Sequence, residues 1–148
     1  MDRIKNENSA ISTIKQYYHG CSAGDVELMI STLSPDVVHY FLQPLTTPVS
    51  GAEHLARYWR KVQKLLDARW EVDFGFAEGS NAVIEWTLYW TNPANGIRLK
   101  TRGAEIYIME KGLIKEIRAY YNQLQDQNSE LVEFDYIARN YSLDKTKK

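Results

Sequence analysis

The fold is indicated most directly by the stretch MEKGLIKEIRAYYN, residues 109–122. Its Glu110-Lys111-Gly112 segment has the composition of a tight turn. The turn separates two runs rich in β-branched and aromatic residues, 97–109 and 113–121, which predicts a β-hairpin. Working back along the chain, the same pattern predicts strands at 82–91 and 69–76, with turns at 92–96 and 79–81 between them.

Before residue 69 the pattern changes from strand to helix. Apolar residues recur at helical spacing in 9–23, 26–33 and 51–68, with Ser9 and Asp25 as predicted N-caps and Gly24 ending the first helix. Ser34-Pro35-Asp36 is predicted to stop the second helix before a short strand at 37–42, and the two prolines of 43–50 predict a loop. Helices followed by a run of antiparallel strands indicate an α+β protein.

Composition limits the classes of function. The chain of 148 residues is expected to form one domain, with a core at 9–122 and an extension at 123–148 that holds a short helix. The net charge of -1 gives no electrostatic case for nucleic acid or membrane as the main partner. The single cysteine, Cys21, cannot form an internal disulfide, and no apolar run is long enough to span a membrane, so a cytoplasmic location is expected. The 10 Tyr and 4 Trp suit either a cavity wall or a core or dimer interface.

Four segments, in this order, resemble the SnoaL-like, nuclear-transport-factor-2-like superfamily of polyketide cyclases and ketosteroid isomerases. They are YYHGCSAGD at 17–25, LSPDVVHY at 33–40, GAEHLARYW at 51–59, and the hairpin stretch at 109–122. The resemblance covers residues 11–122. It implies an α+β cone, in which three N-terminal helices wrap a cystatin-like curved antiparallel sheet around an apolar pocket, and it implies a homodimer. It does not fix the reaction, because this fold hosts isomerases, cyclases, dehydratases, hydrolases and non-catalytic binders.

The resemblance also suggests catalytic residues. The carboxylate base of the isomerases falls at Phe41, which cannot move a proton. His39 shares that face of the strand and is a candidate base or acid, the alternative being a structural histidine in the wall. Glu105 matches the region of the oxyanion-stabilising acid; facing inward its pKa would be raised, whereas facing outward it would pair with a cation. Tyr17 matches the oxyanion tyrosine, and Tyr121 is a candidate for orienting the same oxygen.

The remaining candidates line the expected pocket. Side chains predicted to contact a ligand are Phe41, Leu55, Tyr58, Trp86, Leu88, Trp90, Ile117 and Ala119. Some of these must instead belong to the core. The opposite face of the sheet is expected to carry Glu85, Thr87, Tyr89, Arg118 and Tyr120. The sequence has no metal-ligand cluster, phosphate loop or dinucleotide motif, so no metal or cofactor is predicted.

Three interpretations of function follow. The first is a cofactor-independent cyclase, isomerase or dehydratase that performs acid–base chemistry on a small hydrophobic carbonyl compound, polyketide-like or terpenoid-like. The second is a non-catalytic ligand-binding or dimerisation module, which Phe41 at the usual base position favours. The third is an epoxide hydrolase-like activity, which needs an Asp-Arg-Asp set to which Arg102 and Glu105 could contribute.

Overall fold

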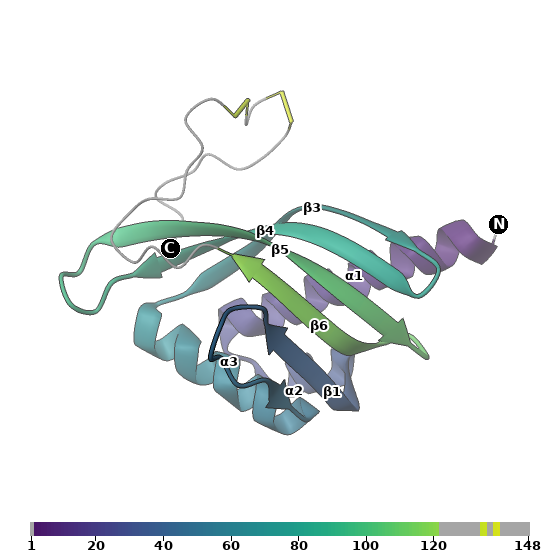
Figure 1. The fold of residues 1–148 in the computed structure, drawn as a ribbon, viewed down its shortest axis with the longest axis horizontal. Coiled ribbons are helices and arrows are strands. Elements are labelled where there is room, and N and C mark those ends of the chain that lie inside the picture. Colours follow the sequence, from purple (N-terminus) through teal and green to yellow (C-terminus); the bar gives the residue numbers. More distant parts are fainter. Residues whose placement is uncertain (1, 122–133, 136–137, 140–148) are drawn as a thin grey trace.

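Three helices lie against one side of a strongly curved sheet in the computed structural model (Figure 1). The structure describes residues 2–121, 134–135 and 138–139, with side chains from residue 9 onward. The elements in chain order are α1 (Asp2–Ala23), α2 (Val26–Thr32), β1 (Leu33–Phe41), β2 (Val49–Ser50), α3 (Ala52–Leu66), β3 (Arg69–Glu78), β4 (Asn81–Thr91), β5 (Arg98–Glu110) and β6 (Leu113–Tyr121). The α+β prediction and the cystatin-like, nuclear-transport-factor-2-like architecture are confirmed.

The sheet is mixed rather than purely antiparallel. Its strand order is β2-β1-β6-β5-β4-β3. β1 and β6 run parallel, whereas the other neighbours are antiparallel. The expectation of an antiparallel sheet was therefore wrong at this one junction. The chain leaves β1, passes through β2, α3 and three more strands, and returns as β6 beside β1.

The helix ends agree with the predicted caps except at the start of α1. That helix begins at Asp2, so Ser9 lies inside it and is not its N-cap. No glycine or proline interrupts residues 2–8, so the sequence there can continue a helix. Gly24 adopts a left-handed φ of 66°, and the Asp25 side chain accepts a hydrogen bond of 3.0 Å from the Leu28 N–H, which confirms both predicted signals. No helix in the described residues is long and apolar enough to cross a membrane.

Strand β1 starts earlier than predicted. It begins at Leu33, so Ser34-Pro35-Asp36 lies within a strand instead of ending a helix in a loop. The pairing of β1 with β6 is nevertheless irregular between Leu33 and Val38. Proline has no N–H to donate to a ladder, which accounts for this break around Pro35. The short strand β2 was missed because it lies in the proline-containing segment predicted to be a loop.

A register shift in β3 moves one predicted core residue to the surface. Regular strand alternation would place Trp70, Val72 and Phe74 on one face, but the pairing with β4 slips between Val72 and Phe74. Trp70 and Val72 pack against the core, whereas Phe74 is 49% exposed. A bulge adds one residue and reverses the alternation of faces, and the sequence pattern gave no sign of it.

Most of the large core side chains lie between the helices and the concave face of the sheet. Leu55 on α3 and Ile117 on β6 are both completely buried there. The predicted C-terminal helix at 131–140 falls for the most part outside the described residues.

Gly103 allows close packing between strands. It pairs with Trp86 across β4 and β5, and a Cβ at this position would stand 2.4 Å from the Trp86 ring and 2.6 Å from the Tyr120 carbonyl oxygen. We expect Gly103→Ala to lower the free energy of unfolding by about 1–3 kcal/mol, because the ring and the strand must move apart. Urea unfolding monitored by tryptophan fluorescence measures this cost. An unchanged midpoint with unchanged fluorescence would contradict the predicted crowding.

Candidate functional site

The concave side of the sheet and the helices enclose a cavity of about 490 Å³, which suits a small organic molecule. The cavity is lined by Tyr17, Tyr18, Cys21, His39, Phe41, Tyr58, Trp59, Val62, Leu66, Trp70, Trp86, Leu88, Trp90, Asn92, Pro93, Ala94, Thr101, Glu105, Ala119 and Tyr121. Half of these residues carry an aromatic ring, His39 included. Among the described residues the wall holds a single carboxyl group and neither lysine nor arginine. A charge inside this wall therefore has few compensating partners.

Glu105 is the carboxyl group of the cavity. It lies on β5, is 6% exposed, and pairs across the ladder with Ala119, whose short side chain also lines the cavity. Tyr18 donates a hydrogen bond of 2.7 Å to Oε2 of Glu105, and the Tyr107 hydroxyl donates to the same oxygen. The prediction that Glu105 faces inward is confirmed, and the alternative of an outward ion pair is excluded by these contacts.

Burial sets the electrostatics of this carboxyl group. Loss of solvation raises the pKa of Glu105 to about 7, although the hydrogen bonds from Tyr107 and Tyr18 oppose the rise. The hydroxyl groups of Tyr18 and Tyr107 have pKa values well above their usual range, first through burial and then through the nearby Glu105 charge. The tyrosines therefore stay protonated as donors. Glu105 is left able to take up or release a proton near neutral pH.

His39 lies in the cavity wall, where its pKa differs strongly from that of an ordinary histidine. Its side chain is 1% exposed, and its ring lies 4.4 Å from that of Phe41 and 5.3 Å from that of Trp59 between centroids. Burial lowers the His39 pKa to about 3, so the imidazole is neutral at physiological pH. Neither ring nitrogen has a hydrogen-bond partner among the described residues. A neutral imidazole can donate or accept a hydrogen bond but holds a proton poorly.

The other predicted site residues divide between cavity and core. Tyr17 and Tyr121 line the cavity, as do six of the predicted ligand contacts: Phe41, Tyr58, Trp86, Leu88, Trp90 and Ala119. Leu55 and Ile117 do not line it and belong to the fully buried core. Strand and helix periodicity places these two on the correct face, but it cannot tell which side chains on that face reach the hollow.

Two important tyrosines were missed by sequence reasoning. Neighbouring residues of a helix point in different directions, which favours only one of Tyr17 and Tyr18 for the cavity, yet both rings are buried and line it, 6.1 Å apart. Tyr107 lies two residues after Glu105, so strand alternation puts both side chains on one face. That spacing was a usable signal for Tyr107, whereas Tyr18 needed the packing of α1 to be known.

Arg102 and Glu105 do not come together in the polar set that an epoxide hydrolase requires. Arg102 lies on the outer face of the sheet, 3.8 Å from Asp73 and 3.6 Å from Glu85, with Phe134 under its guanidinium. Glu105 faces the cavity on the opposite side. Arg102 and Glu105 are an odd number of positions apart on β5 and therefore point to opposite faces. That third interpretation is wrong for these two residues.

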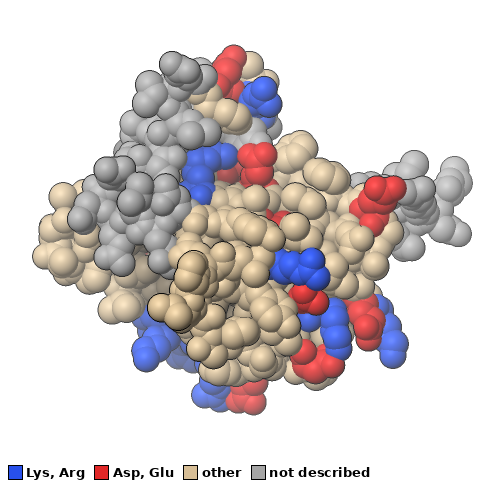
Figure 2. Space-filling view, viewed as in Figure 1, with Lys and Arg blue, Asp and Glu red and all other residues tan. Residues whose placement is uncertain are grey.

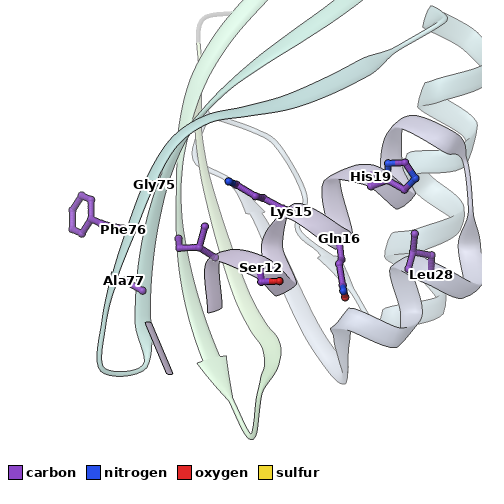
Figure 3. A pocket seen from close by; sticks show the side chains of 9 residues that line it. Ser12, Lys15, Gln16, His19, Leu28, Gly75, Phe76 and Ala77 are labelled. Carbon is purple, nitrogen blue, oxygen red and sulfur yellow. The ribbon is translucent and has the colours of Figure 1, made fainter. Parts of the chain in front are cut away.

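A second, wider hollow lies between α1, α2 and the far end of β3. Its volume is about 750 Å³, and Ile11, Ser12, Lys15, Gln16, His19, Leu28, Gly75, Phe76 and Ala77 line it. Figure 3 shows the Phe76 ring pointing away from α1, and the polar α1 side chains there are exposed to solvent. Water competes with a ligand for groups in such an open groove, so the inner cavity is the stronger candidate site.

The charged side chains on one face of the molecule are mixed in sign. On the face drawn in Figure 2, acidic and basic side chains are interspersed, and no described area is dominated by one sign. No group of three or more His, Cys, Asp or Glu side chains within the described part of the chain is placed to hold a metal ion.

The comparisons with known proteins agree with this geometry. The SnoaL-like domain family matches residues 14–117. The chain belongs to this family. Among curated proteins none matches the chain significantly.

Among solved structures, a cystatin-like-fold protein of unknown function from Methylobium petroleophilum PM1 is 30% identical, with 96% of each chain covered and a TM-score of 0.69. A provisionally assigned polyketide cyclase from Pseudomonas putida KT2440 is 23% identical, over 77% of this chain and 92% of that one, with a TM-score of 0.65. A provisionally assigned ketosteroid isomerase from Kribbella flavida DSM 17836 is 14% identical, over 82% of this chain and 84% of that one, with a TM-score of 0.67. The last two likenesses show the fold alone.

Proposed function

We propose that this SnoaL-like protein is a cofactor-independent enzyme that moves a proton next to the carbonyl group of a small hydrophobic compound. The observation that carries the proposal is Glu105, a carboxyl group with a pKa of about 7, held by two tyrosines in the wall of an aromatic cavity. A general base or acid works best when its pKa lies near the working pH. The outcome would be isomerisation, cyclisation or dehydration of a polyketide-like or terpenoid-like molecule.

The catalytic roles that we propose for the side chains follow from their protonation states and hydrogen bonds. Both tyrosine hydrogen bonds end on Oε2 of Glu105, which leaves Oε1 to meet the substrate. As a carboxylate, Glu105 would remove a proton from the carbon beside the carbonyl, and the C–H electron pair would form the enolate. The protonated Glu105 would then return the proton to the same or another carbon. Tyr17, Tyr121 and neutral His39 would orient or polarise the carbonyl oxygen.

A ligand-binding module without catalysis is the second candidate. Two observations favour it: Phe41 replaces the base expected from the resemblance, and the His39 pKa of about 3 removes imidazole as a base at neutral pH. This candidate keeps the same cavity and the same hydrophobic ligand. It differs in giving Glu105 a binding role alone.

Deuterium exchange separates the two candidates without knowledge of the natural substrate. We expect the protein to accelerate the exchange of the α-protons of 2-tetralone in D₂O, followed by NMR, and the acceleration to saturate with protein concentration. Because the carboxylate is the active base, the rate should rise with pH and level off above a midpoint near 7. Binding of 2-tetralone without acceleration at any pH would leave the binding module as the better description.

A further inference from the structure

Several polar groups of the cavity wall have no hydrogen-bond partner in the part of the chain that the structure describes. The Tyr17 hydroxyl, the Trp59 and Trp86 indole N–H groups and both ring nitrogens of His39 are shielded from solvent and make no hydrogen bond with any described residue. The Cys21 thiol and the Trp59 indole both lie close to the Tyr17 hydroxyl: beyond the larger effect of burial, contact with Cys21 raises the Tyr17 pKa and contact with Trp59 lowers it, but neither contact has the geometry of a hydrogen bond. Buried donors are nearly always paired in folded proteins, so this concentration at one cavity is unusual.

One tryptophan of the cavity wall does have a hydrogen-bond partner for its indole N–H. Trp90 lines the same cavity, but its indole N–H donates to Thr101 Oγ1 at 3.0 Å. The unpaired tryptophans come from two different walls. Trp59 lies on α3 among His39, Phe41, Tyr58 and Trp70, whereas Trp86 lies on the sheet beside Tyr121. The two unpaired N–H groups therefore belong to different walls of the same cavity.

An indole N–H can donate a hydrogen bond and cannot accept one. The unpaired groups of Trp59 and Trp86 thus require acceptor atoms, and Tyr17 and neutral His39 can each donate as well. The surrounding rings favour flat apolar surfaces, on which aromatic side chains stack. An acceptor oxygen on a flat ring system satisfies both requirements, whereas a purely hydrocarbon ligand would leave the donors unpaired.

We propose that the indole N–H groups of Trp59 and Trp86 bind acceptor oxygens of the ligand, which makes them specificity-determining residues for flat polycyclic ketones or quinones. The inference deepens the proposed function, since it concerns the same cavity, but it is about binding and does not need Glu105 to move a proton. Loss of a donor leaves the acceptor oxygen unpaired in a buried site, so selectivity against the oxygen-free analogue should depend on these two side chains.

A matched pair of probes tests the proposal. Fluorenone and fluorene have the same tricyclic shape, but only fluorenone has a carbonyl oxygen. Equilibrium dialysis of each probe against the native protein should give a dissociation constant about fivefold lower for fluorenone, the size of effect that one hydrogen bond in a buried site provides. This preference opposes the greater hydrophobicity of fluorene, so simple burial cannot produce it.

The variants locate the donor. Trp59→Phe and Trp86→Phe keep an aromatic ring and remove the N–H, and at least one of them should bring the two dissociation constants close together. Trp90→Phe is the matched control: it also lines the cavity, but its N–H is already used by Thr101, so the preference for fluorenone should remain. Circular dichroism checks that each variant folds. If one of the two tryptophan variants does not fold, the other carries the test alone.

Three results would overturn the proposal: equal or tighter binding of fluorene by the native protein, a fluorenone preference that survives in both tryptophan variants, or no binding of either tricycle. A water molecule that permanently pairs the N–H groups would produce one of the first two. Absence of a fluorenone preference in the native protein, together with exchange of the 2-tetralone protons, would reject this inference alone. A clear preference without any exchange would reject the proposed enzymatic function alone.

Discussion

Replacing Glu105 with glutamine is expected to slow α-proton exchange from 2-tetralone by at least about 100-fold relative to the native protein, because a positioned general base contributes about that factor or more. Glutamine has nearly the same shape and can still accept hydrogen bonds from Tyr18 and Tyr107 through its amide oxygen. It cannot take a proton in the working pH range. The measurement is the NMR exchange rate at saturating protein, on a pD-corrected scale.

Asp73 supplies the control for this experiment. It is also a largely buried carboxyl group, and loss of solvation raises its pKa to about 6, but it lies on the outer face with Thr87 and Arg102 and does not line the cavity. Asp73→Asn should therefore leave the exchange rate unchanged. Equal rates for the native protein and Glu105→Gln, or equal losses in both variants, would contradict a catalytic role for the cavity carboxyl group.

The sequence predicted the architecture well because hydrophobic spacing and turn composition are local signals. The hairpin around Gly112 and the caps at Gly24 and Asp25 depend on a few neighbouring residues, and all three form as predicted. The errors have long-range causes. The bulge before Phe74 depends on pairing with β4, and the parallel contact of β1 with β6 joins strands far apart in the chain.

The site was only partly predictable for the same reason. The resemblance indicated Glu105 as a candidate but left its inward or outward direction open, and the size of its pKa shift depends on burial by elements distant in sequence. His39 shows the limit most clearly. Its residue type suggested titration near neutrality, whereas complete burial without a charged neighbour lowers its pKa to about 3. The expected homodimer and the catalytic roles themselves stay predictions.

Glu105 should also make the protein less stable as the pH rises from about 4.5 to about 7. The ordinary pKa of a glutamate, 4.5, applies to the unfolded chain, whereas burial raises the folded value to about 7. Between these values the folded protein holds a proton that the unfolded chain has released, so the free energy of unfolding falls with increasing pH. The stabilisation is fully present below pH 4.5 and lost above pH 7. At about 1.4 kcal/mol for each pKa unit, the loss is about 3 kcal/mol.

Urea unfolding of the native protein and of Glu105→Gln at pH 4.5, 6 and 8 isolates this contribution. The raised pKa of Asp73 lowers the free energy of unfolding of both proteins equally as the pH rises. Its contribution therefore cancels when the two free energies are subtracted. The groups facing Glu105 are Tyr17, Tyr18, Cys21 and Tyr107, whose raised pKa values keep them neutral throughout this range. The free energy of unfolding of Glu105→Gln, taken relative to that of the native protein, should increase by up to about 3 kcal/mol between pH 4.5 and 8. A constant difference across the range would mean that Glu105 ionises normally in the folded protein, and with that the reason to regard it as a proton carrier at neutral pH would disappear.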